Sequence, residues 1–282
     1  MTAMSSLEIE RPVRASAPAR SESGAETAFS VGRSFLGIAV LASGVLQLVT
    51  GELVRLVPTA AAGGGRSQSL LPYVVGLVLV AAGCAIATDR RARLAAAVLA
   101  GLIAVSLVLV QLPRIAGNPW VGYVWTNPLK AVALAASGGL VAAGSRAGGA
   151  SPGTHRIASL EALGVFCLAF FLLVAGVQHF VYADFVTALV PSWIPGQRLW
   201  TYFTGVALFA GGAGMLIPRT SRLAATLSAA MIFLWVLLLH IPRAVAGPDH
   251  ANETAGVFEA LAMSGIALMI AGTRRGRTPS RR

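Results

Sequence analysis

The sequence is organised as eight long runs of apolar residues separated by short polar or glycine-rich stretches. Each run approaches the roughly 20 residues that an α-helix needs to cross about 30 Å of hydrocarbon. The pattern therefore predicts eight transmembrane helices, at approximately 34–51, 71–88, 94–112, 127–144, 159–181, 199–217, 223–241 and 255–272. The signal is weakest in the fourth and eighth runs, because Lys130 and Glu259 interrupt them.

The composition agrees with an all-α integral membrane protein. Of the 282 residues, 56% are hydrophobic and 12% are charged, whereas soluble domains carry roughly 25% charged residues. These values exclude a soluble globular enzyme, and they exclude disorder everywhere except at the two ends. The net charge of +11 does not indicate nucleic acid, because the basic residues form short clusters between apolar runs. The expected partner is the lipid bilayer.

The distribution of basic residues predicts the orientation of the chain. One side of the predicted spans carries 16 Arg residues and the other carries 6 Arg or Lys residues. By the positive-inside rule, both termini face the cytoplasm, as expected for a multi-pass protein of the plasma (inner) membrane. Most Tyr and Trp residues lie at the opposite ends of the spans, where they would form an outer aromatic belt: Tyr73, Trp120, Tyr123, Trp125, Tyr182, Trp193, Trp200 and Tyr202.

The second half of the chain repeats the first. At a shift of 129 residues, 15 of the 42 positions from Tyr73 to Arg114 are identical to those from Tyr202 to Arg243, including Gly, Pro and Arg. Since each unit contributes four helices, both units have the same orientation, as in a parallel repeat. The expected organisation is a disordered cytoplasmic tail, a first four-helix unit, a linker, a second four-helix unit and a basic C-terminal tail, at 1–32, 33–144, 145–156, 157–273 and 274–282.

Ionisable side chains within membrane spans are candidate functional residues, because they are costly in hydrocarbon. His179 and His240 lie at the outer ends of two spans in the second half, and Glu259 lies about one turn inside the last span. We expect these side chains to converge near the outer surface, with Gln178, Tyr182 and Arg243 close by. Imidazole can bind a metal or hydrogen-bond a quinone carbonyl. Alternatively, these groups lie at the interface and pair with Arg243 or with water.

The corresponding positions of the first half have different chemistry. Gln47 stands in place of His179, Gln111 in place of His240, and Lys130 near the place of Glu259. Only the second half carries imidazoles, so a single chemical site would belong to it. We expect Gln47 and Gln111 to bridge helices, since an amide in the membrane needs a partner. No spacing motif for a metal is present.

The second half resembles the DoxX-like family of four-helix membrane proteins. The resemblance covers about 155–272 and rests on AGVQHF at 175–180, LVP at 189–191, YFTGVALFAGGAGML at 202–216 and LLLHIPRA at 237–244. It implies a four-helix bundle per unit and, for some members, association with sulfur or thiol redox enzymes, including a subunit of a thiosulfate:quinone oxidoreductase. The chain departs from the family in being duplicated and in having Gln for both His in the first half.

Three functions are consistent with these patterns. The leading hypothesis is an accessory membrane subunit of a redox system, without catalytic activity of its own, that binds a quinone through His179 and His240. A transporter or permease would need a polar path across the membrane, but the polar side chains gather at the outer ends, with Glu161 alone near the inner end. The third hypothesis is a purely structural partner of another membrane protein.

Overall fold

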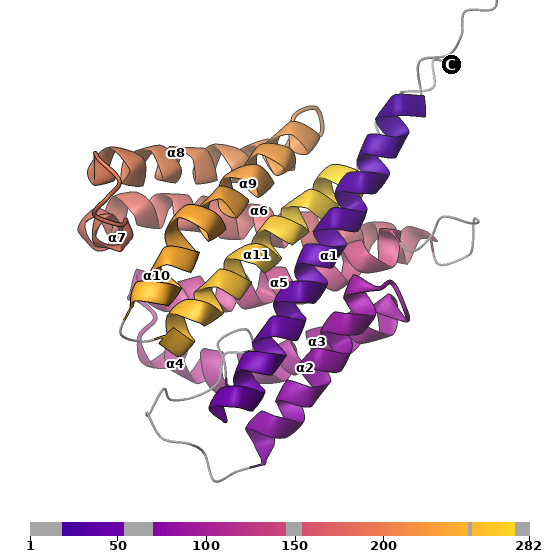
Figure 1. Ribbon diagram of the computed structural model, residues 1–282. Helices are drawn as coiled ribbons and strands as arrows, with labels where there is room; N and C mark the ends of the chain where they lie inside the picture. The colour runs from indigo at the N-terminus through magenta and orange to yellow at the C-terminus, as the bar shows by residue number, and fades with distance from the viewer. Residues whose placement is uncertain (1–18, 54–69, 145–153, 248–249, 274–282) are drawn as a thin grey trace, which may run out of the picture.

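A computed structural model describes residues 19–53, 70–144, 154–247 and 250–273, and every regular element in these residues is helical. Figure 1 shows the helices in chain order. Their bounds are α1 Ala19–Thr50, α2 Leu71–Ala87, α3 Ala92–Ser106, η1 Leu107–Gln111, α4 Leu112–Gly117, η2 Gly122–Trp125, α5 Thr126–Gly144, α6 Thr154–Val181, α7 Ala183–Leu189, α8 Gln197–Leu216, α9 Ser221–Trp235, η3 Val236–His240, α10 Ile241–Ala246 and α11 His250–Thr273. The prediction of an all-α fold is confirmed for this part of the chain.

Six helical segments in the described residues are long and apolar enough to cross a membrane: Ser23–Thr50, Ala92–Gly117, Ala158–Val181, Gln197–Leu216, Ser221–Ala246 and His250–Thr273. A seventh, α2, is apolar but only 17 residues long. The fourth predicted span coincides with α5, which is not among the six. An all-α membrane protein is therefore consistent with the length and composition of these helices.

Two expected boundaries were wrong. Residues 19–32, expected to belong to a disordered tail, are the first part of α1, and residues 154–156, expected to belong to the linker, begin α6. The early start of α1 is stabilised by packing, because Ala25 is buried and Phe29 packs against the core. These are isolated apolar positions among polar ones, so they do not raise the local hydropathy. The expected tails 1–18 and 274–282 lie outside the described residues.

A turn of π-helix interrupts an α-helix at the equivalent position of each half. η1 spans Leu107–Gln111 and η3 spans Val236–His240, and each is followed by a short α-helix with proline at its second position. Proline has no N–H to donate, and its ring clashes with the carbonyl group four residues earlier. A wider turn before Pro113 and Pro242 relieves this clash. Gln111 and His240 are the last residues of the two π-turns, so their directions are set by this irregularity.

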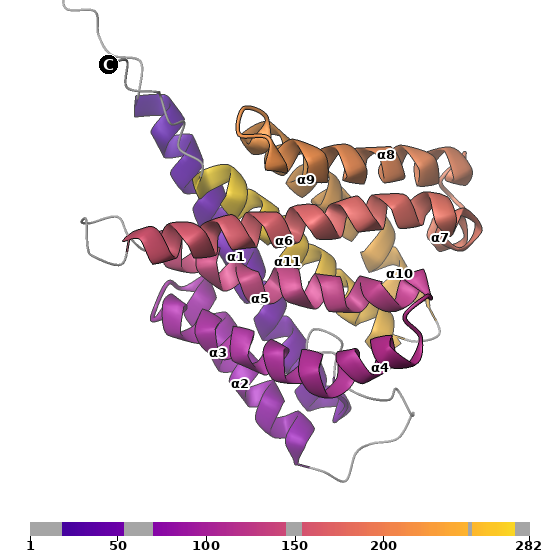
Figure 2. The ribbon, with the colours of Figure 1, turned by 180° about the vertical axis from the view of Figure 1, so that it is seen from behind.

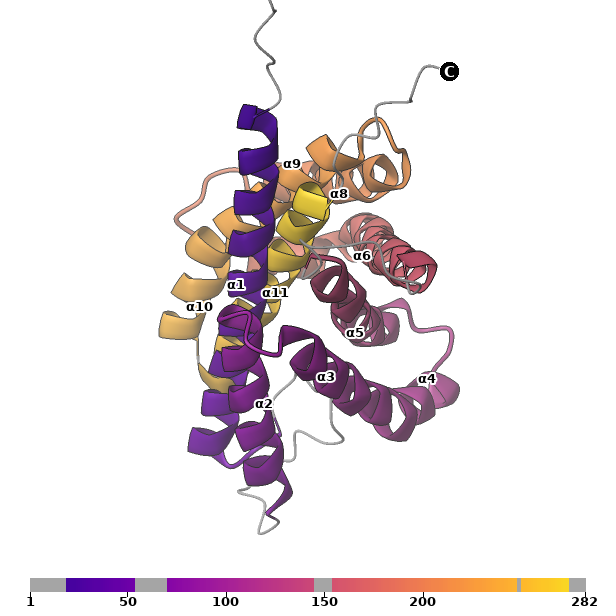
Figure 3. The same cartoon turned by 90° about the vertical axis from the view of Figure 1, so that its right-hand side faces the viewer.

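The helices pack as a closed ring rather than as two separate four-helix bundles. Within each half, consecutive long helices pack on one another, but α1 packs extensively on α11 and α5 packs on α6. α5 and α11 also contact each other in the middle of the molecule. Figures 2 and 3 show α5 beside α6 and α1 beside α11, respectively. The two four-helix units predicted from the repeat are thus in close contact: the first and last helix of each half pack on the other half.

Glycines explain the contacts between the halves. A Cβ atom built on Gly265 of α11 would lie 2.5 Å from the carbonyl oxygen of Gly32 in α1, and one built on Gly139 of α5 would lie 2.3 Å from the carbonyl oxygen of Leu160 in α6. Backbones approach this closely only where the side chain is absent. Small residues at these positions therefore direct the ring arrangement. A search for apolar runs does not detect this, because glycine is spread through all the spans.

The helix ends gather at two opposite ends of the molecule. The N-terminal part of α1, the α8–α9 turn and the end of α11 lie at the upper right of Figure 1, and α4, α7 and α10 lie at the other end. The end with α7 and α10 holds the predicted site residues of the second half. In the predicted orientation, it is the outer end.

Candidate functional site

A cavity of about 1020 Å³ lies in the second half of the structure. Its walls come from α6, α7, α8, α9, η3 and α11, together with Tyr123, Thr126 and Lys130 of the first half. The lining is mainly aliphatic and aromatic. A few polar side chains interrupt it, as is typical of binding sites for small organic molecules. The site is thus formed by both halves, whereas the sequence placed it in the second alone.

His179 is held on α6 by its own backbone. The ring Nδ1 lies 2.7 Å from the carbonyl oxygen of Ala175, one turn earlier. Because a carbonyl oxygen only accepts, Nδ1 carries the hydrogen and donates it, which leaves Nε2 of a neutral ring as an acceptor. Gly205 of α8 makes room for this residue, since a Cβ built there would lie 2.9 Å from the Cβ of His179. Trp235 stacks on the imidazole with ring centroids 6.4 Å apart.

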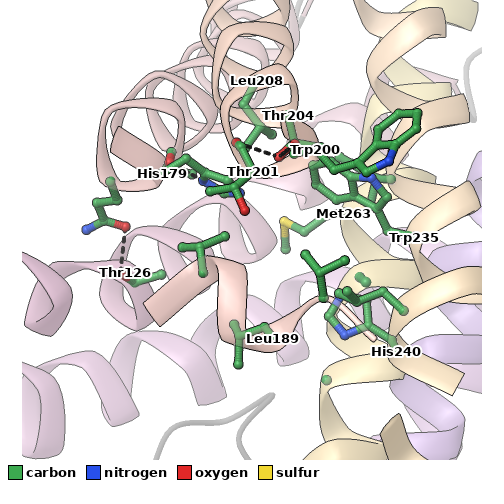
Figure 4. Close-up of a pocket in the computed structure, with 18 of the residues that line it drawn as sticks. Thr126, His179, Leu189, Trp200, Thr201, Thr204, Leu208, Trp235, His240 and Met263 are labelled. Carbon is green, nitrogen blue, oxygen red and sulfur yellow. Dashed lines mark hydrogen bonds between the residues drawn. The ribbon is translucent and has the colours of Figure 1, made fainter. Parts of the chain in front are cut away.

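His240 approaches the same cavity from the π-turn η3. Figure 4 shows His179 and His240 on opposite sides of the cavity, with Met263 between them. His240 lies over Gly256 of α11, where an added Cβ would be 3.5 Å from Nδ1. Within the described residues, no hydrogen bond joins the His240 ring to a protein group. Its nitrogens are therefore available to a ligand as donor or acceptor.

Glu259 pairs with Lys130 instead of standing free beside the histidines. The Lys130 ammonium donates to Oε2 of Glu259, and the side chains are only 21% and 13% exposed. The residues lie 129 positions apart, so they occupy equivalent places in the two halves, where α5 and α11 meet. Both line the cavity. The carboxylate is thus neutralised by the first half, and the pair adds no net charge to the site.

Gln178 and Tyr182 border the cavity, and Gln178 also forms two hydrogen bonds within the fold. Its Nε2 donates to the carbonyl oxygen of Gly122 at 2.8 Å, and its Oε1 accepts from the Thr126 hydroxyl at 2.8 Å (Figure 4). Tyr182 meets Tyr123 edge to face, with ring centroids 6.3 Å apart. Gln178 therefore joins α6 to the start of α5, and its remaining N–H and the Tyr182 ring are candidates for contact with a ligand.

Arg243 is not part of the cavity lining. Its guanidinium forms two hydrogen bonds to Glu253 of α11, at 3.0 and 2.5 Å, and a longer one of 3.4 Å to the carbonyl oxygen of Leu189 after α7. A bidentate pair of this kind fixes geometry and leaves little capacity for another anion. Arg243 therefore joins α10, α11 and the α7 segment at the rim, and Glu253 rather than Glu259 is its partner.

Trp200 was expected among the aromatic residues at the outer ends of the spans, but other cavity residues had no signal in the sequence. Trp200, Thr201 and Thr204 come from α8, and Trp235 is the last residue of α9 before the π-turn. The hydroxyl groups of Thr201 and Thr187 lie 3.0 Å apart, which joins α7 to the start of α8. Aromatic and Thr residues of this kind look like ordinary span residues in a sequence. Pro242 was the one available clue, because a proline implies a helix distortion beside it.

The two glutamines of the first half are both buried, but they differ in their partners. Gln47 of α1 donates its Nε2 to the carbonyl oxygen of Pro72 at 2.7 Å, which joins α1 to the start of α2. Gln111 is 2% exposed, and its Nε2 has no hydrogen-bond partner among the described residues. Gln47 bridges two helices as expected. The expected bridge from Gln111 is absent from this part of the structure.

This difference predicts opposite effects of the same substitution. Gln47→Leu removes the hydrogen bond from Gln47 to the carbonyl oxygen of Pro72 and should destabilise the protein by about 1 kcal/mol. Gln111→Leu removes a buried donor that has no partner, so stability should be unchanged or higher by up to about 1 kcal/mol. Thermal unfolding of both variants in one detergent, followed by intrinsic fluorescence, measures the difference. A Gln111→Leu protein that melts as low as Gln47→Leu would show that the Gln111 amide is paired.

A metal centre has no support among the described residues. They contain no group of three or more His, Cys, Asp or Glu side chains placed to hold a metal ion. His179 and His240 face the cavity from opposite sides (Figure 4), and Glu259 is occupied by Lys130. This arrangement favours an organic ligand between the histidines over an ion bound by both.

Residues 168–270 are similar to a family described as a domain of unknown function, DUF8561. The matched region runs from the middle of α6 almost to the end of α11. It therefore includes His179, His240 and Glu259, and most of the cavity. No curated protein and no solved structure matched the chain.

Proposed function

We propose that this chain is a multi-pass membrane protein that binds a quinone, or a similar planar amphiphile, in the cavity between His179 and His240. It is an accessory subunit of a membrane redox system without catalytic activity of its own. The observation that carries the proposal is the cavity of about 1020 Å³, apolar and aromatic, with one imidazole on each side. Apolar pockets with a few convergent polar groups are the usual form of such sites.

The hydrogen-bonding states of the two histidines suit a quinone or quinol head group. A neutral His179 presents Nε2 as an acceptor, which suits a hydroxyl group. His240 can donate to a carbonyl oxygen on the other side of the ring. Trp235 and the other aromatic side chains of the lining offer faces for the ring to stack on.

The topology belongs to the same proposal. The chain has eight spans, with α2 and α5 added to the six long apolar helices, and both termini face the cytoplasm. The two halves are tandem DoxX-like units that arose by duplication. The helix bounds support this, since α9, η3 and α10 begin and end 129 residues after α3, η1 and α4. The role in a redox system rests on the resemblance to DoxX-like proteins alone.

The test is quinone binding by purified histidine variants. His240→Ala and His179→Ala should each weaken binding about tenfold or more, because each removes a hydrogen bond to a polar head in a desolvated site. His250→Ala is the matched control, since His250 is exposed, lies outside the cavity and has its ring hydrogen-bonded to the carbonyl oxygen of Ala244. Titration of a quinone into detergent-purified protein, followed by quenching of tryptophan fluorescence, gives the dissociation constants.

Extraction of bound lipids from the purified wild-type protein, with metal analysis and an absorption spectrum, identifies any resident ligand. Equal quinone affinity in all three histidine variants would remove the proposed site. A wild-type protein with no quinone affinity and no bound chromophore would favour a purely structural subunit.

A further inference from the structure

α8 and α9 touch closely near the turn that joins them. A Cβ built on Gly211 would lie 2.3 Å from the Ser228 hydroxyl oxygen, and one built on Gly214 would lie 2.8 Å from the Cβ of Ala224. From this turn the two helices diverge toward α7 and α10, as Figure 1 shows. Seven residues, or two helical turns, beyond the Gly211–Ser228 contact, Thr204 and Trp235 are both lining residues of the cavity. The two helices thus border the cavity on either side.

Where α8 and α9 diverge, several side chains line the cavity and are also exposed. Leu234 and Leu238 of the α9–η3 segment line the cavity, yet they are 50% and 40% exposed, and Trp200 of α8 is 46% exposed. The cavity is therefore open, and these side chains mark one side of its opening, between α8 and α9; Phe185 and Trp193, which also line the cavity and are 66% and 61% exposed, mark another side beside α7. Apolar side chains surround the opening, which is the composition expected of a surface in contact with lipid.

The depth of the opening places it in the hydrocarbon layer. Thr204 lies seven residues from the start of α8, or roughly 10 Å at about 1.5 Å per residue, and Leu234 lies thirteen residues from the start of α9, or roughly 20 Å. Both helices have membrane length, and the hydrocarbon layer is about 30 Å thick. An opening at this depth leads to lipid tails, so a water-soluble ligand would have no route through it.

We propose that the ligand enters the cavity sideways from the bilayer between α8 and α9 and keeps a hydrocarbon tail in this opening. This inference rests on the proposed function and narrows its ligand to a tailed, lipid-soluble molecule. The volume supports it, since about 1020 Å³ is at the upper end of the roughly 300–1,000 Å³ of sites for drug-sized ligands. A single planar head fills only part of that space, and the near-absence of charge in the lining suits a hydrocarbon chain.

The experiment uses the full-length protein in phosphatidylcholine nanodiscs and a benzoquinone that carries a photoreactive diazirine in the middle of a ten-carbon tail. After illumination, mass spectrometry locates the labelled residues. We expect labels on α8 and on the α9–η3 segment, around Thr204, Leu234 and Leu238. An excess of the same quinone ring without a tail should compete for the head site and lower the labelling.

Two variants test whether the opening itself is the route. Thr204→Trp fills the opening and should reduce labelling about tenfold, because overpacking of this size is costly. Val206→Trp is the matched control on the same helix: Val206 is 58% exposed and lies outside the cavity lining, so labelling should stay within about twofold. Size-exclusion chromatography shows that both variants are folded.

The outcomes separate the two proposals. Labels that are lowered by the tail-less quinone but fall on α7 or on Trp193 would overturn the lateral route and leave quinone binding intact. Labelling that the tail-less quinone does not lower would overturn the proposed function together with the route. Equal labelling of Thr204→Trp and the wild type would also overturn the route.

Discussion

Replacing Lys130 by alanine is expected to destabilise the protein more than removing any other charged side chain discussed above. The substitution leaves the Glu259 carboxylate without its partner in a largely apolar surrounding, where it is only 13% exposed. Breaking a fully buried ion pair costs about 3–5 kcal/mol. Because some water reaches both groups here, we expect about 2–3 kcal/mol. For a chain of this size, that lowers the Tm by roughly 5 °C or more.

The position of the pair at equivalent places of the two halves gives this prediction a sharp control. Exchanging the charges in Lys130→Glu with Glu259→Lys should recover most of the lost stability, since each side chain then occupies the place of its counterpart. Replacing both by apolar residues, in Lys130→Met with Glu259→Leu, should also recover it, because no unpaired charge remains. Thermal unfolding in detergent, monitored by intrinsic fluorescence, measures all four proteins.

A second ion pair, which is exposed to solvent, serves as the control for the effect of burial on the loss of stability. Arg198 and Asp184 lie 3.1 Å apart, but their side chains are 64% and 90% exposed. Arg198→Ala should therefore change stability by less than about 0.5 kcal/mol. Two results would contradict the claim that the Lys130–Glu259 ion pair joins the two halves. One is a loss of stability in Lys130→Ala as small as that in Arg198→Ala, and the other is an exchanged pair that melts as low as Lys130→Ala.

The sequence predicted the helices well because the free energy of membrane insertion is summed over many residues. Each of the eight apolar runs coincides with a helix. Among the described residues, the observed helix ends differ from the predicted ones mainly where tertiary packing extends a helix. α1 is an example: its first turns are polar, and contacts of Ala25 and Phe29 with the rest of the protein help to hold them in place. A hydropathy pattern has no information about such contacts.

Part of the candidate site was also visible in the sequence. His179, His240 and Glu259 were expected to converge near the outer surface, and all three line one cavity. Their partners could not be found in this way. Lys130 reaches Glu259 only because α5 and α11 meet at the centre of the ring, and Arg243 reaches Glu253 because of the chain direction after Pro242. Each of these contacts depends on how the helices are arranged, and a prediction of membrane spans does not determine that arrangement.

Replacing Gly265 by alanine is expected to open the ring between α1 and α11. The added Cβ would lie 2.5 Å from the carbonyl oxygen of Gly32 and 2.9 Å from the backbone nitrogen of Leu36. Both are backbone atoms, so no side-chain rotation relieves the contact and the helices must move apart. Overpacking of this kind costs about 1–3 kcal/mol. Since α1 packs on α11 along much of its length, we expect a loss of about 2 kcal/mol.

Gly101→Ala is the matched control. Gly101 lies within α3, and nothing lies within 4 Å of a Cβ built there. Alanine is favoured over glycine in a helix by roughly 0.5–1 kcal/mol, so this variant should melt at the wild-type temperature or above it. Thermal unfolding of the two variants in the same detergent gives the comparison.

A Gly265→Ala protein as stable as Gly101→Ala would mean that the ring is open at this place. The two halves would then be joined chiefly through α5 and α6.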